Sequence, residues 1–379
     1  MVASAVSPLP ESTDPGPARQ GRGRYRAALH VHTDRSGQWS YPPLGRFIIP
    51  DCFVPFLDRA RQCAAAGIDL LAITDHDVPF VMSELDRRGL ERLLSNRRRR
   101  LEVVSGEEVT VGDASPAGGR ATAGAHVLIF YRDLNPGRDR DRILRAHREL
   151  HRHTHDAVEL FRFLRTRDDI VDILAHPFAG PRRLGGETLH RLLSEGLIQR
   201  VEAFNGGEVT RGQNRYAAAV AEVYRLGVSS SDDLHRRWGR LRNHTWSAAA
   251  SREEFLDDLV AGRTGGTTVH SPTYLCKYLE LMEGFYLGYL PWLARSVPEL
   301  ARRRGPRSLL WQLAWSGFAA AVWAPASLAG MVRYLSRGSR RSRADFADLA
   351  RLEPRLSRAL ARTSRAGLRP RAAASSGSP

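Results

Sequence analysis

The chain has 379 residues, a formal net charge of +16 and an apolar fraction of 42%, which leaves room for a large globular core. Its three cysteines form no CxxC pair and no metal-finger spacing, which argues against a disulfide framework and for a reducing, cytoplasmic compartment. Residues 1–24 are rich in Pro, Gly, Ser and Ala and lack the pattern of a signal peptide, so we expect them to be disordered.

From residue 25 to about 270, apolar runs of strand length alternate with helix-like segments. The runs cover 27–32, 68–74, 101–106, 125–131, 170–175, 200–205 and 227–231. The helical patterns cover 51–66, 79–97, 138–166, 186–196, 211–226 and 252–261. Continuous apolar strands that alternate with helices are typical of a parallel sheet, and this many units favour a barrel over an open sheet.

Polar side chains capable of binding metal stand at the ends of these runs. In α/β barrels the functional groups gather at the carboxyl ends of the strands, and only His126, at the start of its run, departs from that rule. The set is His30, His32, His76, Glu108, His126, His176, Asp233 and His235. Imidazole and carboxylate without thiolate suit Zn²⁺, Mn²⁺ or Fe²⁺, and eight ligands indicate a cluster of two or three ions.

These motifs resemble a known family. The segments HVHT, TDHD, GEEVT, HVLIF, AHP and SDDLH occur in the order and spacing of the PHP (polymerase and histidinol phosphatase) domain, over roughly residues 25–270. The resemblance implies a distorted (β/α)₇ barrel with a trinuclear metal centre that hydrolyses phosphoesters. It implies that the eight residues are ligands and that Glu108 is the bridging carboxylate, with the adjacent Glu107 as the less favoured match. Relatives usually carry an aspartate where this chain has Gly37, and Asp34 is the candidate substitute.

The expected reaction is hydrolysis of a phosphoester, in a small phosphorylated metabolite or a nucleotide, by a bridging hydroxide that clustered cations activate. We expect His176 or His235 to protonate the leaving group and Asp75 to orient a ligating histidine. Arginines that follow strand ends are candidates for binding phosphate, because a guanidinium can contact it with two donors. They are Arg35, Arg182, Arg183 and Arg236.

Two other functions remain open at this point. An exonuclease would need aromatic platforms on which bases stack, and Phe178 and Trp238 are the candidates. A non-catalytic, metal-binding regulatory module is supported only by Gly37. A second histidine group, 147–155, puts three rings on one helix face; because no carboxylate is placed to complete a site, we expect an exposed face without metal.

The last hundred residues have a different character. Residues 271–379 hold 18 Lys or Arg and 6 Asp or Glu, a net charge of +12, so most of the chain's positive charge lies there. Within the apolar, aromatic segment 271–335, residues 309–332 carry no charge over 24 positions. This segment predicts either an interfacial helical hairpin on an anionic membrane, at its inner face, or a helical cap on the barrel or a dimer interface. The basic tail, 336–379, is expected to be partly helical, and binding of nucleic acid by it is the weaker alternative.

Overall fold

The computed structural model describes most of the chain between residues 24 and 363. The described residues are 24–36, 38–40, 48–50, 52, 54–95, 101–112, 125–179, 184–207, 211–235, 241–269 and 324–363, with the isolated positions Arg302, Arg307, Leu310, Trp311 and Ala314. The strands are β1 (Tyr25–Ala28), β2 (Gln38–Ser40), β3 (Ile48–Pro50), β4 (Leu70–Ile73), β5 (Glu102–Thr110), β6 (His126–Tyr131), β7 (Ile170–Leu174), β8 (Arg200–Asn205), β9 (Gly227–Ser231), β10 (Thr245–Ser247) and β11 (Gly265–Gly266). The helices are α1 (Phe56–Ala65), α2 (Glu84–Leu94), α3 (Arg140–Leu150), α4 (Ala157–Arg165), α5 (Gly186–Ser194), α6 (Arg211–Tyr224), α7 (Arg252–Val260), α11 (Ala324–Leu352) and α12 (Arg355–Thr363).

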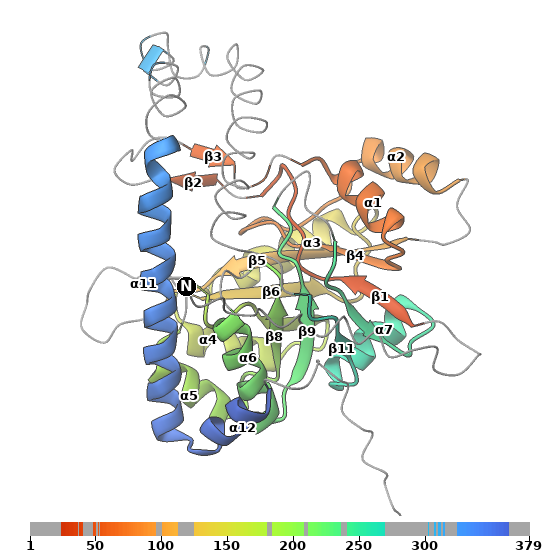
Figure 1. The fold of residues 1–379 in the computed structure, drawn as a ribbon. Helices are drawn as coiled ribbons and strands as arrows, with labels where there is room; N and C mark the ends of the chain where they lie inside the picture. The colour runs from red at the N-terminus through yellow and green to blue at the C-terminus, as the bar shows by residue number, and fades with distance from the viewer. Residues whose placement is uncertain are drawn as a thin grey trace, which may run out of the picture.

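Nine of the described strands form one curved sheet, in the order β11-β10-β1-β4-β5-β6-β7-β8-β9 (Figure 1). The barrel closes where Val31 pairs with Leu234: the backbone N–H of His32 donates to the oxygen of Leu234 (3.1 Å), and that of Leu234 to the oxygen of His30 (3.2 Å). The prediction of a distorted α/β barrel is therefore confirmed. The contacts that close it also join the two segments on which the chain's HxH and DxH motifs lie.

The strand directions differ from a uniformly parallel sheet. β6 runs antiparallel to both β5 and β7, and β10 is antiparallel to β1. Thr110, the last residue of β5, is paired with His126, the first residue of β6. An antiparallel strand brings its amino end to the edge where parallel neighbours end. His126 therefore lies at the same edge as the other strand-end residues, which explains why it stands at the start of its run.

A compact apolar cluster fills the inside of the barrel. It joins alternate residues of β1, β4, β5, β6 and β7 to the buried side chains Phe255, Leu256 and Leu259 of α7. The Tyr25 ring, at the start of β1, lies 5.6 Å from that of Phe255, so α7 covers the end of the barrel at which β1 begins. The opposite end, beyond the carboxyl end of β1, is left for the polar side chains.

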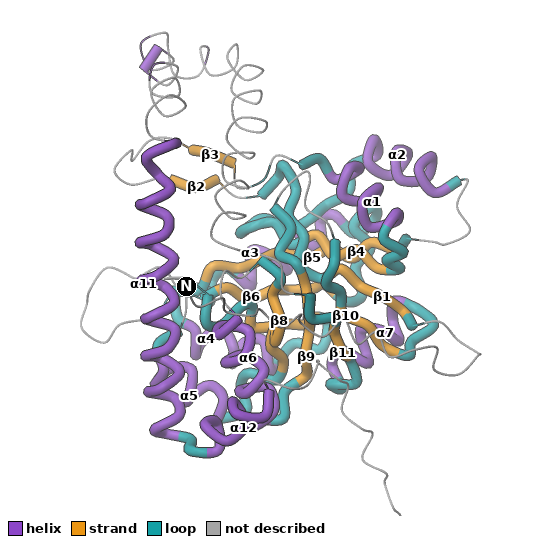
Figure 2. The backbone as a smooth tube through the Cα atoms, viewed as in Figure 1, coloured by secondary structure: helices purple, strands orange, loops and turns teal. Residues whose placement is uncertain are grey.

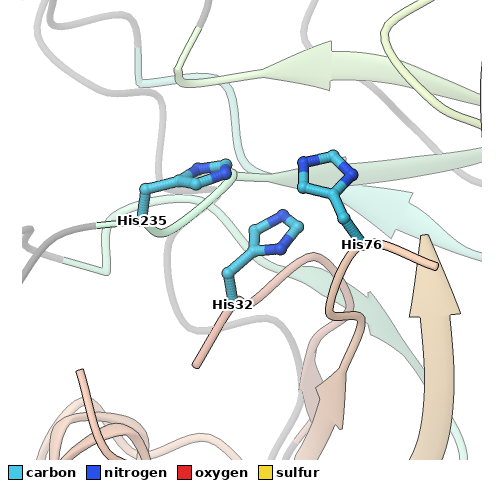
Figure 3. Close-up of side chains that lie close together, drawn as sticks. All are labelled: His32, His76 and His235. Carbon is cyan, nitrogen blue, oxygen red and sulfur yellow. The ribbon is translucent and has the colours of Figure 1, made fainter. Parts of the chain in front are cut away.

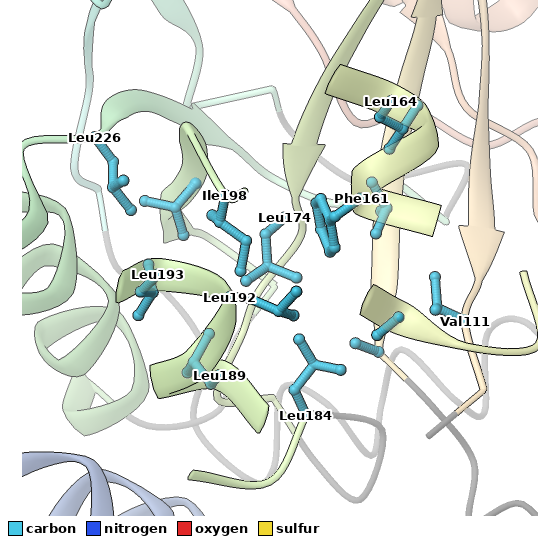
Figure 4. Packing of buried hydrophobic residues seen from close by; sticks show 14 of the residues in the cluster. Val111, Phe161, Leu164, Leu174, Leu184, Leu189, Leu192, Leu193, Ile198 and Leu226 are labelled. Carbon is cyan, nitrogen blue, oxygen red and sulfur yellow. The ribbon is translucent and has the colours of Figure 1, made fainter. Parts of the chain in front are cut away.

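Helices cover the outside of the sheet in two groups (Figure 2). α1 and α2 pack on the strands β1, β4 and the start of β5. A larger cluster holds α3 to α6, together with α11 and α12, on the other side. Figure 4 shows its centre, where Leu174 of β7 meets Phe161 of α4 and Leu192 of α5. These apolar faces fix the strands whose ends carry the site.

Local sequence signals explain where the helices begin. α2 starts with a capping box, in which Ser83 and Asp86 satisfy each other's backbone N–H groups. The predicted helix 138–166 is in fact two helices, because Asp156 accepts from the backbone N–H of Glu159 (2.9 Å) and so caps a new helix after α3 has ended. The break turns the chain after His151.

Part of the tail packs on the barrel as a helical cap. α11 lies against α5 and α6, and α12 against α6. Phe346 stacks on Tyr216 with ring centroids 4.5 Å apart, and Leu349, Leu356 and Ala359 are buried in the same cluster. No described helix is long and apolar enough to cross a membrane. Half of 309–332 lies outside the described residues, so its membrane association stays a prediction, which flotation of the full chain with anionic and neutral vesicles tests.

Replacing Phe346 by alanine is expected to lower the free energy of unfolding by about 3–5 kcal/mol, because it removes a buried ring from the main core cluster. Urea unfolding of the full chain measures the change. Leu352→Ala, at an exposed position of the same helix, is the control and should cost less than about 0.5 kcal/mol. Equal stability of the two variants would show that the cap does not contribute to the fold.

Candidate metal centre

Glu108 lies at the centre of the polar end of the barrel. Its Oε2 faces the ring nitrogens of His30 (3.2 Å), His32 (3.3 Å) and His76 (3.2 Å). Its Oε1 faces those of His126 (2.6 Å) and His176 (3.0 Å). One of its oxygens thus faces three imidazoles and the other faces two, so that this carboxylate could donate to more than one cation.

Asp233 and His235 complete the cluster from the segment after β9. Asp233 Oδ1 lies 3.3 Å from His30 Nε2, 3.4 Å from His32 Nε2 and 3.1 Å from His235 Nδ1. Figure 3 shows the rings of His32, His76 and His235 together, and the centroids of His32 and His235 are 4.0 Å apart. Four overlapping triads could each hold an ion: His32–His76–His235, His30–His32–Asp233, His30–Glu108–His176 and His76–Glu108–His126.

The donor atoms are arranged as ligands of a divalent cation rather than as hydrogen-bond partners of one another. His30 Nε2 is buried and lies between two carboxylate oxygens without a well-directed hydrogen bond to either. Burial opposes charge on Glu108, but the surrounding histidines, His126 foremost, hold the pKa of its carboxyl well below its usual value. Burial likewise opposes charge on His176, but contact with Glu108 raises its pKa to about 9. Buried nitrogen and carboxylate donors that converge in this way are typical of a metal centre.

Glu202 was not among the candidate site residues, yet it orients two of them. Its Oε1 lies 3.0 Å from His30 Nδ1, and its Oε2 accepts from the backbone N–H of His176 (2.9 Å). Asn205 donates to the same Oε2 (3.0 Å). A carboxylate on the second ring nitrogen fixes the tautomer of a ligating histidine, so that Nε2 of His30 is left for the ion. The sequence places Glu202 in a predicted strand of the same barrel, but nothing in that pattern identifies His30, 172 residues away, as its partner.

Asp75 acts on the site through Thr33. Its two oxygens accept from the backbone N–H of Thr33 (2.5 Å) and from the Thr33 hydroxyl (2.6 Å). The aspartate therefore fixes the backbone immediately after His32, whereas we had expected it to hold a histidine ring. The orienting role of Asp75 therefore stays a prediction, and the contacts place it on the backbone after His32.

Two site residues have an unusual backbone. His176 has a φ angle of 23° and Asp233 one of 51°; a positive φ is uncommon outside glycine, although histidine and aspartate are among the residues that adopt it most often. Such conformations persist only where the surroundings impose them, and they concentrate at functional sites. Here the contacts of both residues with the Glu108 cluster provide that constraint.

Arg59 fastens together the two segments that carry the HxH and DxH motifs. Its side chain is fully buried in α1, with Nε donating to the carbonyl oxygen of His32 (2.8 Å) and Nη2 to that of Leu234 (2.9 Å). Cys52 lies 3.4 Å from the same guanidinium. The arginine satisfies two buried carbonyl groups at the point where the barrel closes.

Replacing Arg59 by glutamine is expected to lower the free energy of unfolding by roughly 2–4 kcal/mol, because both carbonyl groups lose a charged donor. Arg61→Gln, on the exposed side of the same helix, is the matched control and should change it by less than about 1 kcal/mol. Denaturant unfolding of the two variants in parallel measures the difference. An Arg59 variant as stable as the Arg61 variant would refute this role.

The structure tests few of the residues predicted to bind substrate. Arg35 pairs with Asp86 (2.5 Å) and donates to the carbonyl oxygen of Val81 (2.9 Å), so its guanidinium already has partners outside the metal cluster. Three further predicted phosphate ligands, one predicted stacking residue and the expected ligand position after the HxH motif lie outside the described residues: Arg182, Arg183, Arg236, Trp238 and Gly37.

Two more sequence predictions concern residues near this end. Asp34 is described and exposed, in the turn after His32, and it belongs to none of the four triads. Phe178, the other predicted stacking residue, is buried between Tyr216 and Phe346, so the prediction that it offers a platform for bases was wrong.

Comparisons with known proteins give only distant similarity. No family model matches the sequence, and no curated protein matches it. A candidate metal-dependent phosphoesterase from Bifidobacterium adolescentis is 14% identical, over 58% of this chain and 91% of its own, with a TM-score of 0.37. PsfC from Pseudomonas syringae is 15% identical over 65% and 92%, with a TM-score of 0.40. An amidohydrolase from Chromobacterium violaceum is 16% identical over 57% and 90%, with a TM-score of 0.35. At these values the likeness assigns no activity, and the function has to be argued from the site.

Proposed function

We propose that this chain is a metal-dependent hydrolase of phosphoesters. The observation that carries the proposal is the Glu108 carboxylate, whose two oxygens face five imidazoles at the polar end of the barrel. With Asp233 and His235, the set has eight donors, enough for two or three ions. Zn²⁺, Mn²⁺ and Fe²⁺ are the ions that suit a site of imidazoles and carboxylates.

Divalent ions held by these residues would make water nucleophilic at neutral pH and would neutralise the charge that develops on a phosphoryl group. The residues of the chain hold the donors in place: Glu202 orients His30, and Asp75 fixes the turn after His32. His235 is the most suitable proton donor for a leaving group. Its side chain is 25% exposed at the edge of the cluster, whereas that of His176 is 8% exposed and lies against Glu108. We therefore assign proton donation to His235, which in that role is not also a metal ligand, so that seven donors are left for the ions.

The substrate in this proposal is a small phosphorylated metabolite or a nucleotide. An exonuclease that acts on oligonucleotides is less well supported, because Phe178 is buried in the core and cannot stack on a base. A regulatory module without catalysis is also less well supported. Its one supporting feature is Gly37, whereas the eight donors and the residues that orient them are all retained.

Metal analysis combined with hydrolysis of an aryl phosphate and a bis-aryl phosphodiester tests the proposal. We expect at least two equivalents of divalent metal, activity on one of the two substrates, and loss of both metal and activity in His30→Ala and Asp233→Ala. Two or more bound ions without activity on either substrate would overturn the phosphoesterase proposal. Activity that survives both substitutions would show that the reaction occurs elsewhere.

A further inference from the structure

A second group of metal-binding side chains lies on the outside of the barrel. Glu107 precedes Glu108 in β5, and because side chains alternate along a strand it points to the opposite face, toward α3. His147 and His151 stand one turn apart on α3 and at its end, and both reach Glu107. The prediction that no carboxylate accompanies these histidines was wrong, because the carboxylate comes from a strand 40 residues earlier in the chain.

The geometry of this group is that of a three-ligand site. Glu107 Oε2 lies 2.9 Å from His147 Nδ1 and 3.0 Å from His151 Nε2, and the three donor atoms lie within 4.8 Å of one another. Ligands of a tetrahedral zinc ion with bonds of 2.0–2.1 Å lie about 3.3 Å apart. An ion could therefore enter between these atoms if they moved by less than about 1 Å.

The residues around Glu107 favour binding of a cation by its carboxylate. Its carboxylate is wholly buried, and the Tyr131 hydroxyl donates to its other oxygen, Oε1, which leaves Oε2 directed at the two rings. Burying a charged carboxylate destabilises the fold unless a cation or hydrogen-bond donors offset its charge. A hydrogen bond to one oxygen also orients a carboxylate that ligates a metal through the other. The side chains of His147 and His151 are 21% and 26% exposed, so an ion and one or more waters could reach the site from solvent.

We propose that Glu107, His147 and His151 form a separate binding site for one divalent cation of the zinc type, which fastens α3 to β5. Two imidazoles, one carboxylate and a water make up a donor set that zinc prefers. The site lies behind the Glu108 cluster, on the other face of the same strand, and shares no ligand with it. The proposal is therefore independent of the hydrolase function.

Zinc stoichiometry of the full chain, measured after removal of loosely bound metal, tests this proposal. The double variant His147→Gln/His151→Gln should bind about one zinc ion fewer than the unsubstituted protein. The matched control is His153→Gln/His155→Gln, which removes two histidines from the same segment that contact the exposed Glu159, and it should lose none. Equal stoichiometry in all three proteins would overturn the proposal.

Two further measurements keep the test valid if the double variant does not fold. In a His32→Gln/Glu108→Gln background, which removes at least one ligand from each of the four triads of the barrel, zinc should still raise the melting temperature, and adding Glu107→Gln should abolish that rise. Zinc-edge anomalous diffraction from crystals of the unsubstituted protein should show a peak between Glu107, His147 and His151. A map with peaks at the Glu108 cluster and none at this group would refute the site.

Discussion

Replacing Glu108 by glutamine is expected to reduce phosphoester hydrolysis at least about 10³-fold and to release metal from the barrel. The glutamine keeps the size of the side chain but removes the negative charge that faces five imidazoles. It also replaces one acceptor oxygen with an amide group that donates, which no cation can use as a ligand. Because Glu108 belongs to two of the four triads, its loss affects more than one ion position.

Metal content and turnover of Glu108→Gln should be measured on the same sample. Glu102→Gln is a suitable control, because Glu102 lies at the other end of β5 and accepts from the Tyr25 hydroxyl (2.6 Å), far from the cluster. The control should keep its full metal content and activity. A Glu108 variant that retained both would show that this carboxylate does not bridge ions.

The sequence predicted the barrel and the convergence of the eight donors because both follow from local patterns. Apolar runs set the strands, and a polar residue after a strand of an α/β barrel lies at the functional end. His126 shows the limit of this reasoning. Its position at the start of a run is explained only by the direction of β6. That strand lies between β5 and β7 and runs antiparallel to both.

Contacts between residues far apart in sequence could not be predicted in this way. Glu202 is 172 residues from His30, and Arg59 is 175 residues from Leu234. A carboxylate in a buried strand or an arginine in a helix has no local pattern that identifies its partner. The pairing of Glu107 with His147 and His151 escaped prediction for the same reason, because which face of β5 carries Glu107 depends on the register of the strand.

These distant contacts also explain why the metal ligands can be held close together. Several buried histidines and carboxylates around one point would destabilise the fold if their charges were not compensated. Glu202, Asp75 and Arg59 each bind a residue of the HxH segment or its backbone. These contacts therefore help to hold the cluster together, and the protonation of its histidines is a measurable property of metal-depleted protein.

The metal-free protein is expected to bind divalent ions far more tightly at pH 9 than at pH 6.5. Contact with Glu108 raises the pKa of His176 from 6.5 to about 9, and the neighbouring carboxylates, Asp233 first, raise that of His30 in spite of its burial. A ring nitrogen must lose its proton before it can bind an ion, so each displaced proton weakens binding below the raised pKa. The proton on His176 alone makes the affinity for a divalent ion differ on the order of 100-fold between pH 6.5 and pH 9.

Competition with a chromophoric chelator of known pH dependence, at several pH values between these limits, measures the effect. Glu202→Gln should flatten the profile, since Glu202 contributes to the raised pKa of both histidines. The same protonation stabilises the metal-free fold: the contribution from His176 is complete below pH 6.5 and is lost as the pH rises through about 9. The melting temperature of the metal-free protein should therefore fall across the interval in which its affinity for metal rises. Affinity that does not change with pH would mean that these histidines are already neutral and that Glu108 does not hold their protons.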